Sequence, residues 1–310
     1  MNDCRRFFFV NFLAGLSLAI ILVGGLGCSS SPPEQARSGV DDEFDRTSRA
    51  ARTAFDNGKF QQAVNLYSQA LERAYVLDDL NAIVDSQYNL AVCLTGLRSY
   101  GPALERVNQA KIELARSNHS IPVDVLLLEA TIQYRLENLE DAWLLTEKIL
   151  QKSNLASAAV VGKTHFLRGL IANAKGDISQ LRREIAFLDT PAAIGLQSDR
   201  EELAGLLSMA KGNWHEAAEA FDRTAELRRK DLDYSGMVNA LAQAARAYEQ
   251  AAKLSEASKR YLRAGRSAAQ QGENHDALKW LNRAEKLAGE AGDEFTAKQA
   301  RSYRKWIEEP

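Results

Sequence analysis

The sequence predicts an all-α chain of antiparallel helical hairpins stacked into an α-solenoid. From about Asp45 to Trp306 the chain is rich in Ala, Leu, Glu, Gln, Arg and Lys, and the alternation typical of strands is hard to find. Apolar residues recur every three or four positions, which is the helical period. Short breaks with Gly, Asn or Asp separate the helical stretches. Such breaks lie at Asn57-Gly58, Lys175-Gly176-Asp177, Lys211-Gly212-Asn213 and Gln271-Gly272-Glu273.

Residues 1–27 differ from the rest of the chain. Two arginines near the start are followed by a largely apolar stretch from Phe7 to Leu26, and small residues precede Cys28. A basic start, an apolar stretch and small residues at the cleavage point are typical of an export signal. Two alternatives remain. One is a permanent transmembrane anchor, since about 20 apolar residues can span a bilayer, and the other is plain secretion.

The segment Leu26-Gly27-Cys28 resembles the end of a bacterial lipoprotein signal peptide, although Gly25 stands where a larger aliphatic residue is more usual. The resemblance implies that the thiol of Cys28 receives a diacylglyceryl group and that Cys28 becomes the new N-terminus. Ser29 and Ser30 fit sorting to the outer membrane of a Gram-negative cell, facing the periplasm. A Gram-positive host would keep the protein outside its cytoplasmic membrane instead.

Residues 29–43 contain Ser, Pro, Gln, Gly and acidic residues with almost nothing apolar. This composition is typical of a flexible linker. We therefore expect three parts: a lipoprotein signal peptide over 1–27, a tether over 28–43 and a helical repeat domain over 44–310.

The helical part repeats one pattern of small residues. Ala51, Gly58, Ala63, Tyr67 and Ala70 follow one another at spacings of seven, five, four and three. Small residues let two antiparallel helices approach, and the bulky residue of the second helix fills the gap. The same spacings recur from Gly205 to Thr224, from Ala245 to Ala264 and from Gly265 to Ala284, and more weakly from Ala91 to Ala110, Ala130 to Ile149 and Gly169 to Leu188.

Two of these segments, Asp56 to Val64 and Ala210 to Ala218, resemble the tetratricopeptide repeat family, and Tyr88-Asn89-Leu90-Ala91 matches the start of such a repeat. The resemblance covers about residues 44–290 and implies a solenoid of helical pairs. Two departures stand out. The first small residues of successive copies lie 40, 39, 39, 36 and 40 positions apart, whereas the family repeat has about 34 residues. Most copies also lack the closing proline.

Three segments predict particular helix positions. One helix near Ser255 to Gln271 ends one pair and opens the next, because two repeat patterns overlap there. Residues 294–308 are expected to form a helix that covers the last face of the array. Ser198-Asp199-Arg200-Glu201 has the form of a capping box, which marks the start of a helix.

The resemblance also implies a binding surface, because the first helix of each pair in this family lines a concave groove that binds an extended or helical peptide. The alternative for the aromatic positions is that they belong to the core between repeats. The Lys and Asn residues by which some family members hold a C-terminal carboxylate are absent. The residues of this sequence that stand at the groove positions of the family are Arg52, Phe55, Tyr88, Thr95, Leu127, Tyr134, Phe166, Leu170, Leu206 and Arg246.

The sequence shows no pattern of an enzyme, a metal site or a cofactor site. Val161-Gly162-Lys163-Thr164 ends like a phosphate-binding loop, but Ser157 stands where that loop needs its first glycine. Cys93 lies in an apolar helical stretch, which predicts a buried structural thiol. No second His or Cys lies at metal-ligand spacing from His119, His165, His215 or His275.

Net charge argues against nucleic acid as a partner. The chain has 39 Lys and Arg against 41 Asp and Glu, a net charge of −2. Its short basic runs, each with acidic residues nearby, do not form a nucleic-acid footprint. These runs are Arg182-Arg183, Arg228-Arg229-Lys230 and Lys259-Arg260.

These features together predict a non-enzymatic scaffold or adaptor. It would be held at the bacterial cell envelope by a lipid on Cys28 and would bind a protein or peptide partner there. The alternative is a helical-repeat lipoprotein that binds a small ligand such as a nutrient.

Overall fold

The computed structural model describes residues 41–193 and 195–309, and every regular element in these ranges is a helix. The expected signal peptide, Cys28 and all but the last residues of the expected tether lie outside the described residues. None of the helices described is both long enough and apolar enough to cross a bilayer.

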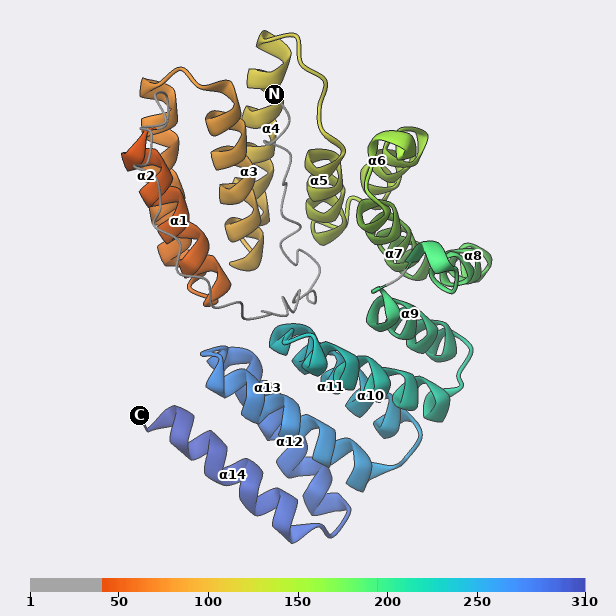
Figure 1. Ribbon diagram of the computed structural model, residues 1–310. Coiled ribbons are helices and arrows are strands. Elements are labelled where there is room, and N and C mark those ends of the chain that lie inside the picture. Colours follow the sequence, from red (N-terminus) through yellow and green to blue (C-terminus); the bar gives the residue numbers. More distant parts are fainter. Residues whose placement is uncertain (1–40, 194, 310) are drawn as a thin grey trace, which may run out of the picture. The chain divides into compact units, whose positions relative to one another are not determined.

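The chain forms two compact units, which we call the N-terminal unit (described residues 41–160) and the C-terminal unit (161–193 and 195–309). Figure 1 shows their helices along the chain. The N-terminal unit contains α1 (Asp42–Asp56), α2 (Phe60–Val76), α3 (Leu80–Gly96), α4 (Tyr100–Arg116), α5 (Val123–Arg135), α6 (Leu139–Gln151) and the 3-10 turn η1 (Ser153–Leu155). Helix α7 (Ala158–Lys175) begins there and continues into the C-terminal unit, which contains α8 (Ile178–Leu188), the 3-10 turn η2 (Pro191–Ala193), α9 (Gln197–Ala210), α10 (Trp214–Lys230), α11 (Tyr234–Gln250), α12 (Leu254–Gln270), α13 (Asn274–Glu290) and α14 (Glu294–Glu308).

Consecutive helices pack against each other within each unit, which confirms the predicted all-α fold of antiparallel hairpins. In the N-terminal unit the contacts run from α1 on α2 to α5 on α6, and in the C-terminal unit from α8 on α9 to α13 on α14. Helix α12 packs against both α11 and α13, as the overlapping repeat patterns predicted. Helix α14 has the predicted bounds and covers α13 and α12 at the end of the array.

Most turns between consecutive helices share one backbone geometry, and the exceptions are the connections that contain η1 and η2. At the end of α1 the N–H of Gly58 donates to the carbonyl of Phe55 at 2.8 Å, and the N–H of Lys59 donates to the carbonyl of Ala54 at 2.9 Å. This Schellman motif needs a left-handed residue just after the helix. Glycine supplies it at Gly58, where φ is 72°. Residues with a side chain take the same conformation at other turns, namely at Asp78, Arg98, Asn118, Glu137, Leu232 and Ala252.

We expect Leu232→Gly to raise the free energy of unfolding by about 1 kcal/mol, because the left-handed conformation costs a residue with a Cβ roughly this much. Leu232 has φ 60°, and its exposed side chain packs little. Denaturant titration of the variant and the wild type measures the difference. Leu232→Ala is the control, because alanine keeps the Cβ and should bring no such gain. An equal gain from both variants would show that backbone conformation is not the cause.

Small residues sit where the repeat pattern placed them, against bulky side chains of the next helix. A Cβ built on Gly205 of α9 would lie 2.8 Å from the ring of Phe221 on α10. A Cβ on Gly265 of α12 would lie 2.6 Å from Leu281 on α13. Real Cβ atoms do not approach other atoms so closely, so these helix pairs depend on glycine for their separation.

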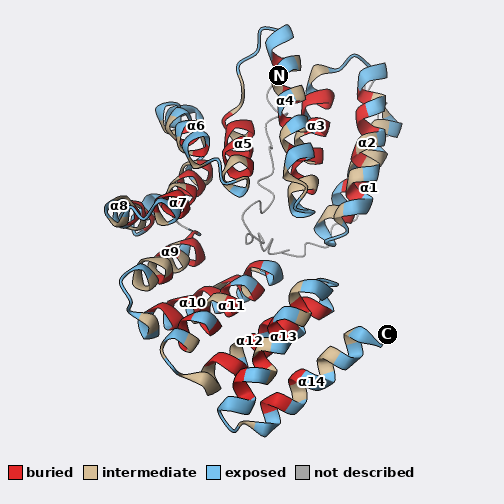
Figure 2. Cartoon of the chain, turned by 180° about the vertical axis from the view of Figure 1, so that it is seen from behind, coloured by how far each residue is buried: buried red, intermediate tan, exposed pale blue. Residues whose placement is uncertain are grey.

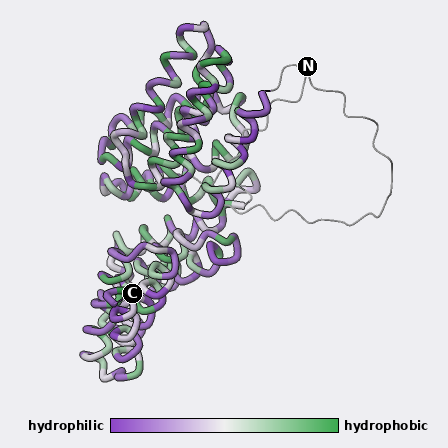
Figure 3. Tube along the Cα trace, turned by 90° about the vertical axis from the view of Figure 1, so that its left-hand side faces the viewer, coloured by the Kyte–Doolittle hydropathy of each residue, from purple (hydrophilic) through white to green (hydrophobic). Residues whose placement is uncertain are grey.

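Each unit has its own core. In the N-terminal unit Tyr67 of α2 packs with Ile83 and Leu90 of α3 in one buried cluster. In the C-terminal unit the core from α10 to α13 is mostly alanine, with larger side chains such as Phe221 and Leu281 between. Figure 2 shows the buried residues in red on these helices, and Figure 3 shows hydrophobic and hydrophilic stretches alternating along the chain. Burial therefore follows the predicted helical period.

Cys93 is a free cysteine, fully buried in the core of the N-terminal unit. Burial raises the pKa of its thiol to about 12, so the thiol stays protonated at neutral pH. The prediction of an inert structural thiol is confirmed.

The helix start predicted at Ser198 is confirmed to within one residue, but the capping box itself is not formed. Helix α9 begins at Gln197 with Leu196 as its N-cap, so Ser198 and Asp199 lie inside the helix, and both are buried. The carboxylate of Asp199 accepts a hydrogen bond from the ammonium of Lys163 at 2.6 Å. Asp199, which lies within the predicted motif, thus pairs with a side chain of another helix.

Candidate partner-binding site

In the N-terminal unit, the first helices of three successive pairs bring polar groups together around Tyr88 of α3. Tyr88 is half-buried. The pKa of its phenol is raised by burial and by the negative charges of Asp124 on α5 and Asp85 on α3. The charge of Arg52 on α1 acts on Asp85 in turn. We call Arg52, Asp85, Tyr88 and Asp124 the Tyr88 cluster.

The two carboxylates of the Tyr88 cluster are held in an environment that disfavours their charge. Burial and the negative charge of Asp79 raise the pKa of Asp85 to about 6, against the opposing effect of Arg52. Burial also raises the pKa of Asp124. Asp85 is nevertheless exposed to solvent, and Asp124 is half-buried. The carboxylate of Asp85 is thus accessible, although the protein around it displaces enough water to weaken its hydration.

We expect Asp85→Asn to raise the melting temperature at about pH 7.5, with a gain that shrinks as the pH falls towards about 4. The pKa of Asp85 is about 6 in the fold against 3.8 for the unperturbed group. Because the folded-state pKa is the higher one, the ionised carboxylate costs stability above pH 6, and this cost disappears as the folded protein takes up a proton.

Thermal unfolding across this pH range measures the effect of Asp85→Asn. Glu105→Gln is the control, because Glu105 is an exposed residue on α4. Its difference from the wild type should not follow the same pH course. A gain for Asp85→Asn that is equal at every pH would contradict the prediction.

The other expected groove residues of the N-terminal unit lie further along the same helices. Phe55 is half-buried, and its ring packs edge-on against Phe60 with the centroids 5.3 Å apart. Thr95 is half-buried and donates its hydroxyl to the carbonyl of Ala91 at 2.8 Å. Tyr134 is half-buried, with the guanidinium of Arg135 at 5.8 Å from its ring centroid. Leu127 is buried.

Of the expected groove residues in the C-terminal unit, Phe166 and Leu170 are buried in α7. Leu206 is partly buried against the alanine-rich core, and Arg246 is exposed on α11. The structure thus places Arg52 and Tyr88 in one cluster, whereas Leu127, Phe166 and Leu170 are each less than one tenth exposed and offer little surface to a partner.

Sequence reasoning missed Asp85 and Asp124, although a signal for them exists. Each lies six residues before the small residue that opens its repeat pattern, Ala91 or Ala130. We call this place the register position. In the other repeats it is occupied by Asp45, Lys163, Asp199, Asn239 and Lys259.

In the C-terminal unit, the register positions of two successive repeats touch. The ammonium of Lys163 on α7 lies 2.6 Å from the carboxylate of Asp199 on α9, and both side chains are buried. The guanidinium of Arg228 lies 3.7 Å from Asp199 and 3.3 Å from Asp233, and it also pairs with Glu202. We call these five residues the buried ionic network.

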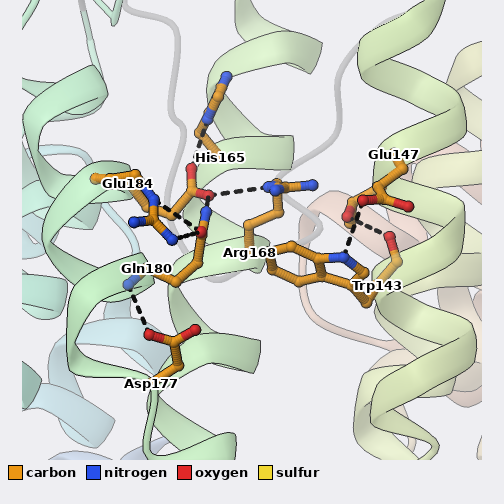
Figure 4. A network of polar contacts seen from close by, with 9 residues as sticks. Trp143, Glu147, His165, Arg168, Asp177, Gln180 and Glu184 are labelled. Carbon is orange, nitrogen blue, oxygen red and sulfur yellow. Dashed lines mark hydrogen bonds and ion pairs between the residues drawn. The ribbon is translucent and has the colours of Figure 1, made fainter.

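A second polar network joins α7 to α8 (Figure 4). The carboxylate of Glu184 is buried, with Nδ1 of His165 at 2.6 Å and Nε of Arg168 at 2.9 Å, and it also accepts a hydrogen bond from Gln180. Burial acts to raise the pKa of Glu184, but the hydrogen bonds from these three side chains outweigh it and lower the pKa. The ring of His165 stacks on Phe187 with centroids 3.6 Å apart. These side chains therefore stabilise the contact between α7 and α8.

One open cavity of about 500 Å³ lies between the end of α8 and helices α9 and α10. Arg200 and Arg223 line it, but Arg200 pairs with Asp189 at 2.7 Å and Arg223 pairs with Glu201 at 2.8 Å. Its charges are therefore largely matched within the cavity. Nowhere in residues 41–193 and 195–309 do three or more His, Cys, Asp or Glu side chains gather in a way that could hold a metal ion.

Solved structures share this fold at low sequence identity. NprR in complex with its cognate peptide NprX matches with a TM-score of 0.63 at 12% identity, over 85% of this chain and 79% of that one. The signal transduction ATPase PH0952 from Pyrococcus horikoshii, which has a tetratricopeptide repeat sensor, matches with a TM-score of 0.55 at 15% identity, over 85% of this chain. The chain has a tetratricopeptide-repeat fold. It spans only 42% of PH0952.

A third structure with this repeat fold is a Rap protein complexed with competence and sporulation factor. It matches with a TM-score of 0.54 at 10% identity, over 86% of this chain and 77% of the Rap protein. No protein-family model and no curated protein matches the chain.

Proposed function

We propose that this repeat protein is a non-enzymatic adaptor that binds a segment of a partner protein along the first helices of its N-terminal unit. The observation that carries the proposal is the Tyr88 cluster, in which three first helices present polar and aromatic side chains at one accessible place. NprR and the Rap protein, which share the fold, were solved with NprX and with competence and sporulation factor. Their complexes support a binding role for this fold.

We further propose that the adaptor is anchored at the bacterial cell envelope by a lipid on Cys28, with the outer membrane facing the periplasm as its location. The support is the sequence from Leu26 to Ser30, which resembles a lipoprotein processing site. Mass spectrometry of the protein from the membrane fraction tests it. A lipid adduct that disappears in Cys28→Ala supports the anchor, and an unprocessed, unmodified chain in the membrane contradicts it.

Affinity capture tests the adaptor function. The full-length chain, extracted from membranes in mild detergent, is expected to retain an envelope protein, and Phe55→Ala combined with Tyr88→Ala should weaken this capture. Tyr234→Ala is the control, because it removes an aromatic side chain that is accessible to solvent but lies on α11 of the other unit. Capture that is equal in the double variant and the control would remove the N-terminal unit as the binding surface.

The cavity beside α8 favours a second candidate function, the binding of a small ligand such as a nutrient. The cavity has a volume of about 500 Å³, which is enough for a small ligand. Thermal unfolding with a panel of metabolites separates the two functions, because a ligand that binds the folded state raises the melting temperature. A shift that Arg223→Ala abolishes would favour the small-ligand function.

A further inference from the structure

The connection between α2 and α3 exposes three consecutive large apolar side chains. Tyr75 is 46% exposed, Val76 is 74% exposed and Leu77 is 40% exposed. The side-chain amide of Gln87 on α3 donates to the hydroxyl of Tyr75 at 3.3 Å, so the exposed ring is held in place. Single exposed apolar residues are common, whereas a contiguous group marks a surface that meets another protein or a membrane. We call Tyr75, Val76 and Leu77 the apolar turn.

The chain enters the described fold beside the apolar turn. Asp41, the first described residue, caps α1 by accepting a hydrogen bond from the N–H of Phe44 at 2.8 Å. Its other carboxylate oxygen lies 2.5 Å from the guanidinium of Arg73, which belongs to the last turn of α2, two residues before Tyr75. Helices α1 and α2 pack side by side (Figure 1). The start of α1 and the apolar turn therefore lie at the same end of this hairpin.

This position has a consequence for a chain that is anchored at Cys28. Asp41 lies 13 positions after Cys28, and a stretch of that length spans at most about 45 Å even when fully extended. The anchor therefore keeps the start of α1 within reach of the bilayer surface. The apolar turn beside it is presented to the lipid at a high effective concentration, so that even a weak attraction suffices for contact.

The charges around the apolar turn indicate the class of lipid. Two of the nearby acids are already matched, because Asp79 caps α3 through the N–H of Asn81 at 2.9 Å and Asp41 pairs with Arg73. Asp78, which directly follows Leu77, is exposed. Exposed carboxylates are repelled by anionic headgroups. The apolar turn therefore suits a bilayer surface of zwitterionic lipids.

We propose that Tyr75, Val76 and Leu77 contact the surface of the membrane that carries the lipid anchor, with zwitterionic lipids as their partner. Tyrosine rings are typical of the region between headgroups and acyl chains, and the apolar side chains beside the ring are buried at the same boundary. This inference rests on the proposed anchor at Cys28 and adds the surface by which the folded part meets the bilayer. In this arrangement the α1–α2 turn at Lys59 lies away from the lipid.

A fluorescent label at Val76 tests the contact in the full-length chain, reconstituted from detergent into phosphatidylcholine vesicles. Val76→Cys carries an environment-sensitive fluorophore, and the wild-type chain taken through the same labelling gives the background. Lys59→Cys is the matched control, because Lys59 is exposed at the other end of the hairpin, one helix length or roughly 22 Å away.

We expect nitroxide groups on the lipid acyl chains to quench the label at Val76 at least about threefold more than the label at Lys59, because only the first is buried at the boundary of headgroups and acyl chains. The emission at Val76 should also shift to the blue when vesicles are present. Equal quenching at the two positions, or quenching at neither, would overturn the proposal.

Removal of the neighbouring apolar side chains tests the cause of the contact. In the Val76→Cys chain, Tyr75→Ser with Leu77→Ser should reduce the quenching to the level at Lys59, because the attraction comes from burial of apolar surface. Leu97→Ser is the control and should leave the quenching unchanged, since Leu97 is also exposed but lies in the α3–α4 turn at the opposite end of α3. Quenching that survives in the double variant would overturn the proposal.

The composition of the vesicles tests the lipid class. Replacing part of the phosphatidylcholine with phosphatidylglycerol should weaken the quenching at Val76 at low salt, and added salt should restore it. Stronger quenching in the anionic vesicles would overturn the zwitterionic partner. A blue shift in detergent that grows with protein concentration, without quenching by lipid nitroxides, would identify a second copy of the chain as the occupant and would overturn the membrane contact.

The outcomes separate this inference from the anchor on which it rests. Mass spectrometry of the same preparation shows whether Cys28 carries a lipid. A lipid adduct without quenching at Val76 leaves the anchor standing and removes the membrane contact of the apolar turn. Quenching at Val76 that depends on Tyr75 and Leu77, in a chain without the adduct, supports the contact and removes the anchor.

Discussion

Replacing Arg228 with alanine is expected to lower the free energy of unfolding by about 3–5 kcal/mol, the usual cost of removing one partner from a buried ionic group. Arg228 is 4% exposed and faces three carboxylates, those of Asp199, Glu202 and Asp233. Without the guanidinium, the buried charges of Asp199 and Asp233 would be opposed by Lys163 alone, whereas the half-buried Glu202 could still be hydrated. Chemical denaturation of the variant and the wild type measures the loss.

The pH dependence of Arg228→Ala gives a further check on the cause. Burial raises the pKa of Asp233, and the charge of Arg228 opposes that rise. In the variant the folded-state pKa of Asp233 rises further. The ionised form of this carboxylate costs stability at neutral pH, and the cost falls as the folded state takes up a proton at lower pH. The deficit of Arg228→Ala should therefore shrink on acidification.

Arg229→Ala is the matched control for Arg228→Ala. Arg229 is the next residue on α10, but it is exposed and pairs only with Glu226, one helical turn away. Surface pairs of this kind contribute little. A similar loss of stability in both variants would show that helix α10, rather than the buried ionic network, is sensitive to substitution.

Replacing Phe221 with alanine is expected to cost about 3–5 kcal/mol, as is usual when a buried aromatic side chain leaves a cavity. Phe221 is 0% exposed and fills the space beside Gly205 between α9 and α10. Phe295→Ala is the control, because Phe295 on α14 is 72% exposed. Urea unfolding of the two variants measures the contrast, and similar losses would contradict the packing argument.

A double-mutant cycle identifies the contact itself. Gly205→Ala alone should destabilise the protein, since its Cβ would lie 2.8 Å from the Phe221 ring. In the background of Phe221→Ala the same methyl group enters the vacated space and should restore part of the lost stability. A reversal of sign between the two backgrounds is the expected result. Additive losses would show that the two residues do not share this space.

The sequence was sufficient for the helices because their period and packing are local properties. The breaks at Gly58, Gly176, Gly212 and Gly272 became turns, and the last helix has the bounds expected for it. Turns without glycine were harder to predict. Their backbone hydrogen bonds can be made by any residue that tolerates a left-handed conformation. The residue type of Leu232 therefore did not indicate that a helix ends there.

Side chains with partners in distant repeats could not be assigned from sequence. In the sequence, Arg228 is one of three consecutive basic residues, and nothing nearby identifies its partners. In the fold, carboxylates from α9 and from the start of α11 surround it. Asp199 lies within the sequence pattern of a capping box, yet its carboxylate pairs with Lys163 of α7. Tyr88 was expected at the binding surface, whereas Asp85 and Asp124 became noticeable only once their helices were in contact. Long-range pairing, rather than local preference, decides such positions.

The ion pair between Lys163 and Asp199 has a consequence for how such arrays diversify. In the C-terminal unit this pair joins the first helices of two successive repeats inside the protein. A substitution at either residue would leave the other with a buried charge that has lost this partner, which is costly. The two positions are therefore expected to change together as the sequence diverges.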